Sequence, residues 1–139
     1  MANKNNTSFP SCTVTITLTP EARNFLAGTT AGVSHFAIYN DLLDNMAIVD
    51  TSFSKRGNIV PLLTGQAESS AHSMSERWKL SRKSMVRILS TMDDLGIIRL
   101  HTSRLASISD MLSVDKCQTN DGDICYPDFS NLPPDPQSD

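Results

Sequence analysis

The segment from residue 74 to residue 95, MSERWKLSRKSMVRILSTMDDL, constrains the fold of this 139-residue chain more than any other. From Met85 onwards its apolar residues recur every three or four positions, which is typical of a helix with one buried face. Before that, Met74 and Trp78 lie four residues apart, as on one face of a shorter helix, and Leu80 follows in a turn. The segment therefore predicts two short helices that share a core and leave the polar face of the second helix outward.

Serine residues mark where these two helices begin. Ser69 or Ser70 can cap the first helix, which is expected to run to about Trp78. Ser81 can cap the second helix, which is expected to cover residues 82–95. A serine hydroxyl at such a position accepts a hydrogen bond from a backbone N–H that has no partner within the helix.

The pattern changes from helical to extended at Gly96, which stands where a left-handed residue commonly ends a helix. Residues 97–101 are extended and apolar, residues 102–104 can turn, and residues 105–109 can return as a partner strand. This turn contains neither Gly nor Asn, the residues that tight hairpin turns favour. A two-stranded hairpin is therefore predicted directly after the second helix.

The residues before this segment predict three further elements. Alternating apolar and threonine residues over 13–18 indicate a half-buried strand, and Thr19 followed by Pro20 marks the start of a short helix. Apolar residues every three or four positions over 35–47 predict a longer helix that faces the core. Residues 51–58 are polar and basic, and a loop is expected there.

The residues after Ser113 have a different composition, with four prolines, six aspartates and few branched apolar side chains. Such a composition offers little apolar surface to bury and is typical of disordered segments. We therefore expect a flexible N-terminus over 1–12, one folded domain over 13–112, and an acidic, proline-rich, disordered tail over 113–139.

Helix, turn, helix, glycine and hairpin in this order resemble the winged helix-turn-helix domain of bacterial and phage regulators, including the GntR and MarR groups and some plasmid replication initiators. The resemblance covers residues 59–109 and rests on the runs SRKSMVRIL and LGIIRL. Two positions depart from it: Lys79 stands where Gly is common in the turn, and Ser75 where Ala is common in the first helix. The resemblance implies a mainly α fold with a small β component, extended by the N-terminal strand and helices.

The net charge of −3 conceals an uneven distribution along the chain. Residues 76–104 contain seven Lys and Arg against three acidic residues, a net charge of +4. From residue 110 to the end, seven Asp face one Lys, a net charge of −6. A basic centre followed by an acidic tail indicates that the central segment, and not the whole chain, is the part that suits a polyanion.

The candidate site is the start of the second helix together with the tip of the hairpin. Side chains at the start of such a helix would face the major groove of double-stranded DNA, where Arg and Lys donate to guanine and Ser bonds to bases or phosphates. The alternative is an ordinary solvated helix face. Lys55 and Arg56 form a second small basic spot. An ordinary loop without a binding role is the favoured interpretation for these two residues, because nothing in the sequence fixes their direction. The expected DNA-binding residues are Ser81, Arg82, Lys83, Ser84, Arg87 and Arg104.

We therefore expect a DNA-binding protein, a transcriptional regulator with the helix over 82–95 in the major groove and the hairpin tip near 102–105 beside it. The alternative is a protein–protein interaction module, or a replication or mobilisation accessory protein of a mobile element. Homodimerisation is expected because one such helix reads few base pairs, and the apolar face over 35–47 offers a pairing surface.

No catalytic residue, cofactor or metal site is expected, because neither the histidines nor the cysteines have the spacing of a ligand set. The three cysteines, Cys12, Cys117 and Cys125, are an odd number, and no apolar targeting run follows the polar start. A cytoplasmic protein with reduced cysteines and no membrane span is the simplest interpretation.

Overall fold

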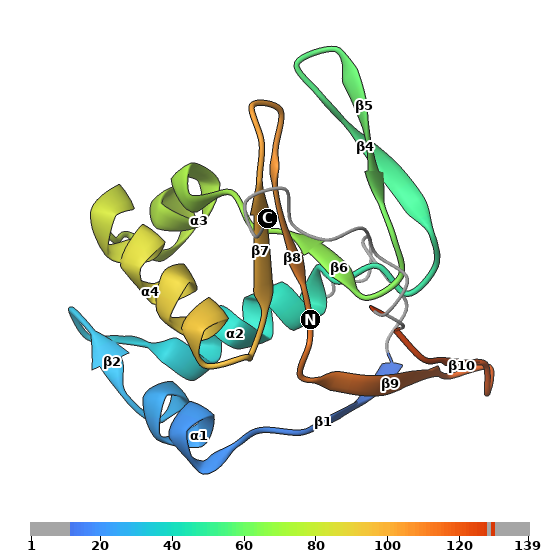
Figure 1. The fold of residues 1–139 in the computed structure, drawn as a ribbon, viewed down its shortest axis with the longest axis horizontal. Coiled ribbons are helices and arrows are strands. Elements are labelled where there is room, and N and C mark those ends of the chain that lie inside the picture. The colour runs from blue at the N-terminus through green and yellow to red at the C-terminus, as the bar shows by residue number, and fades with distance from the viewer. Residues whose placement is uncertain (1–11, 128, 130–139) are drawn as a thin grey trace, which may run out of the picture.

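The computed structural model of the chain describes residues 12–127 and residue 129. Within these residues, four helices and ten strands form a mixed α/β fold with four small sheets (Figure 1). The elements are β1 (Cys12–Ile16), α1 (Pro20–Leu26), β2 (Thr29–Thr30), β3 (Val33–Ser34), α2 (His35–Asp44), β4 (Thr51–Lys55), β5 (Asn58–Leu62), β6 (Gln66–Glu68), α3 (Ala71–Trp78), α4 (Arg82–Asp94), β7 (Arg99–Thr102), β8 (Ser107–Asp110), β9 (Val114–Thr119) and β10 (Ile124–Cys125).

The expectation of a mainly α chain with a small β component is wrong. Helix and strand each account for about 32% of the described residues. Much of the difference comes from a region expected to be a loop, which forms strand β4, and from a region expected to be a disordered tail, which forms strands β9 and β10. Strand β5 agrees with a brief extended segment expected over residues 58–63.

Helices α3 and α4 begin and end close to the predicted residues. The hydroxyls of Ser70 and Ser81 accept hydrogen bonds from backbone N–H groups three residues later, so both serines are the expected caps. Lys79, at the turn position where Gly is common, adopts the left-handed conformation with φ 58° and ψ 40°. The turn thus imposes its backbone geometry on a side chain that disfavours it. Gly96 ends α4 with φ 76°, as predicted.

A three-stranded sheet with the order β6-β8-β7 follows from the hairpin and lies against α4. Strands β7 and β8 pair antiparallel from Arg99 opposite Asp110 to Thr102 opposite Ser107, which confirms the predicted hairpin. Its turn needs no Gly or Asn because the hydroxyl of Ser103 accepts hydrogen bonds from the backbone N–H groups of residues 105 and 106. The helices and this sheet enclose the main core, whose fully buried members include Tyr39, Met74, Met85, Met92 and Ile98.

Residues 51–58 form a strand and a turn where a loop was expected. Strands β4 and β5 pair antiparallel, with Lys55 opposite Asn58, so that Arg56 and Gly57 alone make the turn. Both turn residues have positive φ, 52° and 80°, as a two-residue type I′ hairpin requires. The sequence did not predict this turn because its first residue is Arg, whereas Asn or Asp followed by Gly is the usual sequence signal of a type I′ turn.

The description of residues 113–127 as disordered tail is also wrong. Strand β9 pairs with β1, and β10 adds a third strand. Val114 and Cys117 are buried in the main core, and the Ser113 hydroxyl donates to the Ile97 carbonyl oxygen and bonds the Tyr39 hydroxyl. A chain cut after Val114 would lose a core strand and is expected to unfold. Residues 1–11, 128 and 130–139 lie outside the described part.

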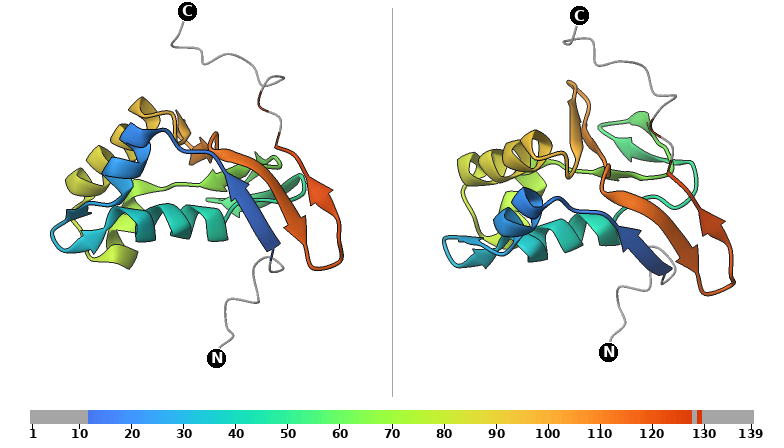
Figure 2. Two further views of the ribbon diagram at one scale, coloured as in Figure 1. Left: turned by 90° about the horizontal axis from the view of Figure 1, so that it is seen from below. Right: turned by 60° about the horizontal axis from the view of Figure 1, so that its bottom comes forward.

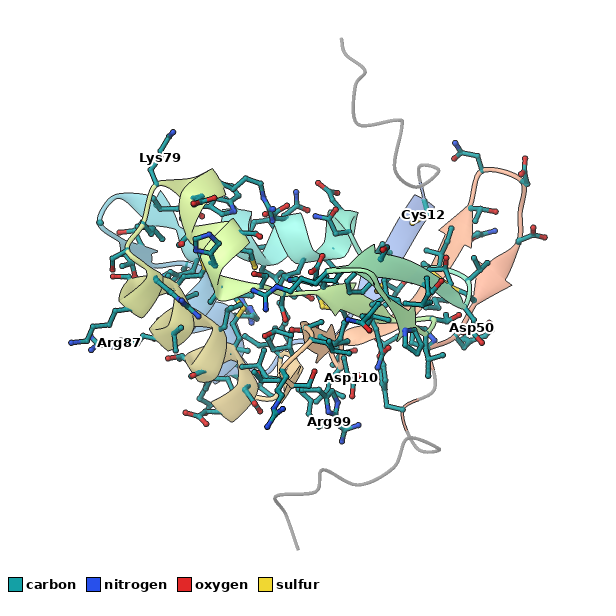
Figure 3. All side chains as sticks on the ribbon, turned by 90° about the horizontal axis from the view of Figure 1, so that it is seen from above. Cys12, Asp50, Lys79, Arg87, Arg99 and Asp110 are labelled. Atoms are coloured by element: carbon teal, nitrogen blue, oxygen red, sulfur yellow. A yellow bond between two sulfur atoms is a disulfide. The ribbon has the colours of Figure 1, made fainter. Side chains whose placement is uncertain are left out.

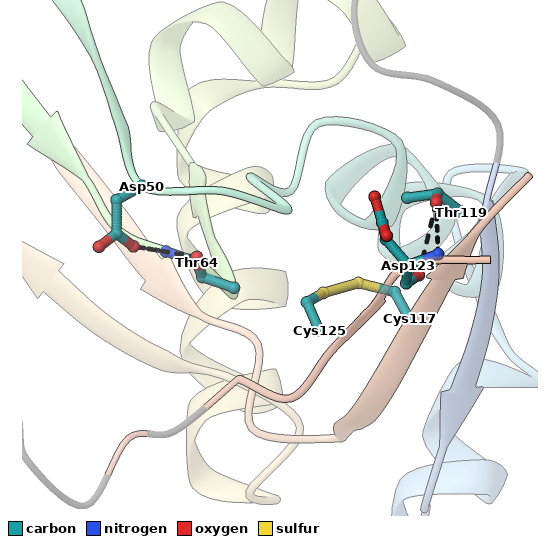
Figure 4. Close-up of a disulfide and its surroundings, with 6 residues drawn as sticks. All are labelled: Asp50, Thr64, Cys117, Thr119, Asp123 and Cys125. Carbon is teal, nitrogen blue, oxygen red and sulfur yellow. Dashed lines mark hydrogen bonds between the residues drawn. A yellow bond between two sulfur atoms is a disulfide. The ribbon is translucent and has the colours of Figure 1, made fainter. Parts of the chain in front are cut away.

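Cys117 and Cys125 are joined by a disulfide between β9 and β10, with their Cα atoms 5.4 Å apart (Figure 4). The expectation of reduced cysteines is therefore wrong for this pair, whereas Cys12 is a free thiol. Burial raises the pKa of Cys12, and the nearby Asp44 carboxylate raises it further. No helix in the described residues combines the length and apolar character that crossing a membrane requires. A cytoplasmic location stays a prediction.

Candidate nucleic-acid interface

Helix α4 separates its side chains into two faces. Met85, Ile88, Leu89 and Met92 are buried, while Lys83, Arg87 and Ser90, spaced four and three residues apart, follow the exposed face. Arg87 points away from the body of the molecule (Figure 3). The helix therefore presents a polar, basic face on a well-anchored backbone.

The two serines of the candidate site are bonded to the helix itself. The Ser81 hydroxyl accepts a hydrogen bond from the Ser84 backbone N–H at 3.0 Å and donates to the Ser84 hydroxyl at 2.9 Å. Ser81 is exposed and Ser84 is half-buried. Their first role is to hold the start of α4, and from there they position Arg82 and Lys83, which follow immediately.

Arg104 lies in the turn between β7 and β8 and is exposed. The sheet brings this hairpin next to α4, since β7 packs against the helix. The hairpin and the helix are therefore packed together through β7, whereas a joint use of the helix face and the hairpin tip stays a prediction.

Ion pairs divide the basic residues of the central segment into two groups. Arg77 is bound to Asp41 of α2 at 2.7 Å, and the Trp78 indole N–H donates to the same carboxylate at 2.9 Å. Arg99 is bound to Asp110 at 3.0 Å. Within residues 12–127 and 129, no ion pair involves Arg82, Lys83, Arg87 or Arg104. Arg77 and Arg99 are therefore tied to carboxylates of the fold although their side chains are 50% and 39% exposed, whereas the other four cations have no such partner in the described residues.

A buried polar cluster at the base of the β7–β8 hairpin was not predicted. The Asp110 carboxylate is fully buried and accepts hydrogen bonds from Gln66 at 2.8 Å and from Arg99 at 3.0 Å. The ring of His101 lies 2.8 Å from the same carboxylate. Three side chains from β6 and β7 thus converge on one carboxylate of β8 and fix the hairpin to the sheet. The available sequence signal for this cluster was the presence of charged and polar residues within otherwise apolar strands.

Val86 was also missed. It lies on α4 between Lys83 and Arg87 in sequence, and its side chain is 46% exposed. The spacing of the buried residues already excluded it from the core stripe, and that exclusion was the available signal. An exposed branched apolar side chain between two unpaired cations gives this face one apolar contact point.

The described acidic residues of the C-terminal region lie away from this face. Strands β9 and β10, which carry Asp115 and lead to Asp121 and Asp123, are at the opposite end of the molecule from α3 and α4 (Figures 1 and 2). These three carboxylates therefore do not compete for the α4 cations in this structure.

The apolar face of α2 is largely used within the chain. Ile38, Tyr39 and Leu42 are buried in the main core, as is Met46 just after the helix, and Phe36 remains 48% exposed. A homodimer that pairs through this face would have little more than Phe36 and its surroundings to contribute. Homodimerisation stays a prediction without this support.

Comparison of the chain with models of known protein families, with curated protein sequences and with solved structures finds no match to any of them.

Proposed function

We propose that this protein binds double-stranded DNA, with α4 in the major groove and the β7–β8 hairpin beside it, and that it serves as a transcriptional regulator. The observation that carries the proposal is that four exposed cations without ion pairs in the described residues, Arg82, Lys83, Arg87 and Arg104, belong to α4 and to the hairpin that packs against it. A surface of free cations suits a phosphate backbone, because each contact releases a condensed counterion. The resemblance of residues 59–109 to winged regulators, itself a prediction, agrees with this use.

The exposed face of α4 suggests how its residues would divide the work. Lys83 and Arg87 can donate hydrogen bonds to guanine or to phosphate oxygens. Val86 between them offers the apolar contact that the C5-methyl group of thymine accepts. We expect Arg82 or Lys83 to contact a base edge and Arg87 to contact phosphate, with Val86 favouring thymine at a neighbouring position.

The first test is selection of binding sites from random duplex DNA, followed by fluorescence anisotropy at two salt concentrations. Arg82→Ala or Lys83→Ala should cost about 1–3 kcal/mol on the selected site and relax its sequence preference. Arg87→Ala should weaken all sequences alike and reduce the salt slope by about one. Arg23→Ala is the matched control, because Arg23 is an exposed arginine on α1, which is not part of the proposed interface. If Lys83→Ala and Arg87→Ala melt normally and bind duplexes as the parent does, the proposal is wrong.

Val86 permits a second, independent test at the level of one methyl group. Replacing single thymines of the selected site by deoxyuridine removes the methyl and leaves base pairing unchanged. At the thymine that Val86 contacts, this replacement should weaken binding of the parent protein and have no further effect on Val86→Ala. If deoxyuridine at every thymine weakened binding of Val86→Ala as much as it weakened binding of the parent protein, the contact between Val86 and a thymine methyl group would be contradicted.

The alternative of a protein-interaction module is favoured by one observation. Val86 on α4 and Leu105 at the hairpin tip are 46% and 40% exposed, so the same surface has apolar points as well as charge. A protein partner would leave binding to heparin weak and independent of Arg87. Retention of the parent and of Arg87→Ala on a heparin column therefore separates the two functions.

A further inference from the structure

The β4–β5 hairpin stands beside the β7–β8 hairpin, and both tips project toward the same side of the molecule (Figures 1 and 2). The tip of β4–β5 carries Arg56, and the tip of β7–β8 carries Arg104. Both arginines are exposed. Two basic tips thus occur side by side, although their residues lie almost fifty positions apart in the chain.

The β4–β5 hairpin is held in this position by a small apolar cluster of its own. Val60 and Leu62 are 8% and 6% exposed, and they pack with Ala47, Ala106 and Ile108. Because Ala106 and Ile108 belong to the turn and second strand of the neighbouring hairpin, this cluster connects the two hairpins directly. Their relative direction is therefore set by packing.

A second contact holds the far half of the hairpin. The Lys55 ammonium group bonds the Glu68 carboxylate of β6 at 2.9 Å. This ion pair uses the charge of Lys55 and leaves Arg56 as the tip cation without an ion pair in the described residues. The type I′ geometry at Arg56 and Gly57 fixes the tip backbone.

We propose that the β4–β5 hairpin is a second arm that contacts phosphates of the same DNA duplex, beyond the part reached by α4 and the β7–β8 hairpin. This inference rests on the proposed function and adds to it the length of duplex that the protein needs. Each strand has five residues, so the arm extends about 17 Å at the usual rise per residue. Ser52 and Ser54 on its exposed face supply hydroxyl groups that bond phosphate oxygens.

The test replaces Arg56 by Asn. Asn-Gly is the sequence that type I′ turns favour most, so Arg56→Asn removes the charge while keeping the turn. Anisotropy is measured with two duplexes that carry the same selected site, one of about 12 base pairs and one of about 24, roughly one and two helical turns. Thermal melts of every variant check the fold.

On the long duplex, Arg56→Asn should weaken binding roughly fivefold and lower the salt slope by about one. On the short duplex it should bind as the parent does, because the phosphates that Arg56 contacts are missing there. Arg23→Ala, with the same loss of charge far from both hairpins, should bind both duplexes normally.

Equal affinity of Arg56→Asn and the parent for the long duplex would overturn the second arm, as would an equal loss on both duplexes. In either case Lys83→Ala and Arg87→Ala still report on α4, so the proposed function is judged separately. A parent protein that binds neither duplex would overturn both proposals.

Discussion

The two neighbouring hairpins are each closed at the base by an aspartate, but in opposite surroundings. In β7–β8, the Asp110 carboxylate is fully buried and accepts hydrogen bonds from Gln66 and Arg99, and the His101 ring lies within hydrogen-bond distance of it. In β4–β5, Asp50 is exposed and accepts two hydrogen bonds from Thr64, both at 2.9 Å (Figure 4). A carboxylate out of contact with water must keep all its donors, whereas an exposed one exchanges them for water at little cost.

The β7–β8 hairpin is also more fully covered by neighbouring strands and helices than the β4–β5 hairpin. Strand β8 is paired on both sides, with β6 and β7, and α4 packs against β7. Among residues 12–127 and 129, strands β4 and β5 pair with each other alone, and the apolar cluster covers one of their faces. We therefore expect β7–β8 to be part of the cooperative fold and β4–β5 to open locally at lower free energy.

The largest expected effect comes from Asp110→Ala, which leaves Arg99 and Gln66 without their acceptor. The loss should be about 3 kcal/mol of unfolding free energy, at the low end for a broken buried pair because Arg99 is partly exposed. Urea denaturation followed by circular dichroism measures it. Asp94→Asn, at an exposed position of α4, is the control and should change stability by less than about 0.5 kcal/mol. A small loss for Asp110→Ala would mean that the cluster does not anchor the hairpin.

Leu62→Ala should cost about 2 kcal/mol, because it removes a buried side chain from the small cluster under β4–β5. Amide hydrogen exchange should show faster exchange in β4 and β5 with little change in β7 and β8. Ile59→Ala is the control, since Ile59 lies on the same strand and is 71% exposed. If protection fell equally in both hairpins, the two would form one cooperative unit and the comparison would fail.

Ser103→Ala should cost about 1 kcal/mol, because two turn N–H groups lose the hydroxyl that accepts them. The turn is solvent-exposed, so water partly replaces the lost acceptor. Thermal melts measure the loss, and Ser103→Asn should restore much of it, since an Asn side chain can accept the same bonds. Failure of this rescue would show that the backbone alone holds the turn.

The smallest expected effect concerns acid and the base of β4–β5. Hydrogen bonds from the Thr64 backbone N–H and hydroxyl lower the pKa of Asp50 below its ordinary value. A lowered folded pKa means that this contribution is complete above the ordinary Asp pKa, about 3.9, and is lost as pH falls through the folded value. NMR titration of the Thr64 amide should show the loss at acidic pH, and Asp50→Asn should remove the transition. A Thr64 amide chemical shift that does not change at acidic pH would contradict the stabilising role of the Asp50–Thr64 hydrogen bonds.

Local signals explain why α3, α4 and the β7–β8 hairpin were predicted. Ser70, Ser81 and Gly96 mark helix ends within a few residues of the groups they bond, and the apolar spacing in α4 identifies its buried face. The exposed positions of Arg82, Lys83 and Arg87 followed from the same spacing. Caps and periodicity involve residues within one or two turns, so one sequence suffices to identify them.

The missed parts depend on partners far along the chain. Strand β4, TSFSK, pairs with the adjacent β5, but it has one large apolar residue, and Ala106 and Ile108, which complete the apolar cluster of this hairpin, lie far along the chain. Strand β9 pairs with β1, about one hundred residues earlier, and its aspartates suggested disorder. The Asp110 cluster likewise joins β6, β7 and β8, and no pattern within any one strand indicates it.

The pairing of β1 with β9 has a consequence for the order in which the chain folds. Cys12 lies opposite Thr119, so β1 has no partner until more than one hundred further residues have been synthesised. The contacts of α3, α4 and β7–β8 connect residues close in sequence and form at small entropic cost, whereas closing the β1–β9 loop is slow. On the ribosome, contacts among α3, α4 and the β7–β8 hairpin would therefore form early, but the complete core waits until β9 has been synthesised and pairs with β1.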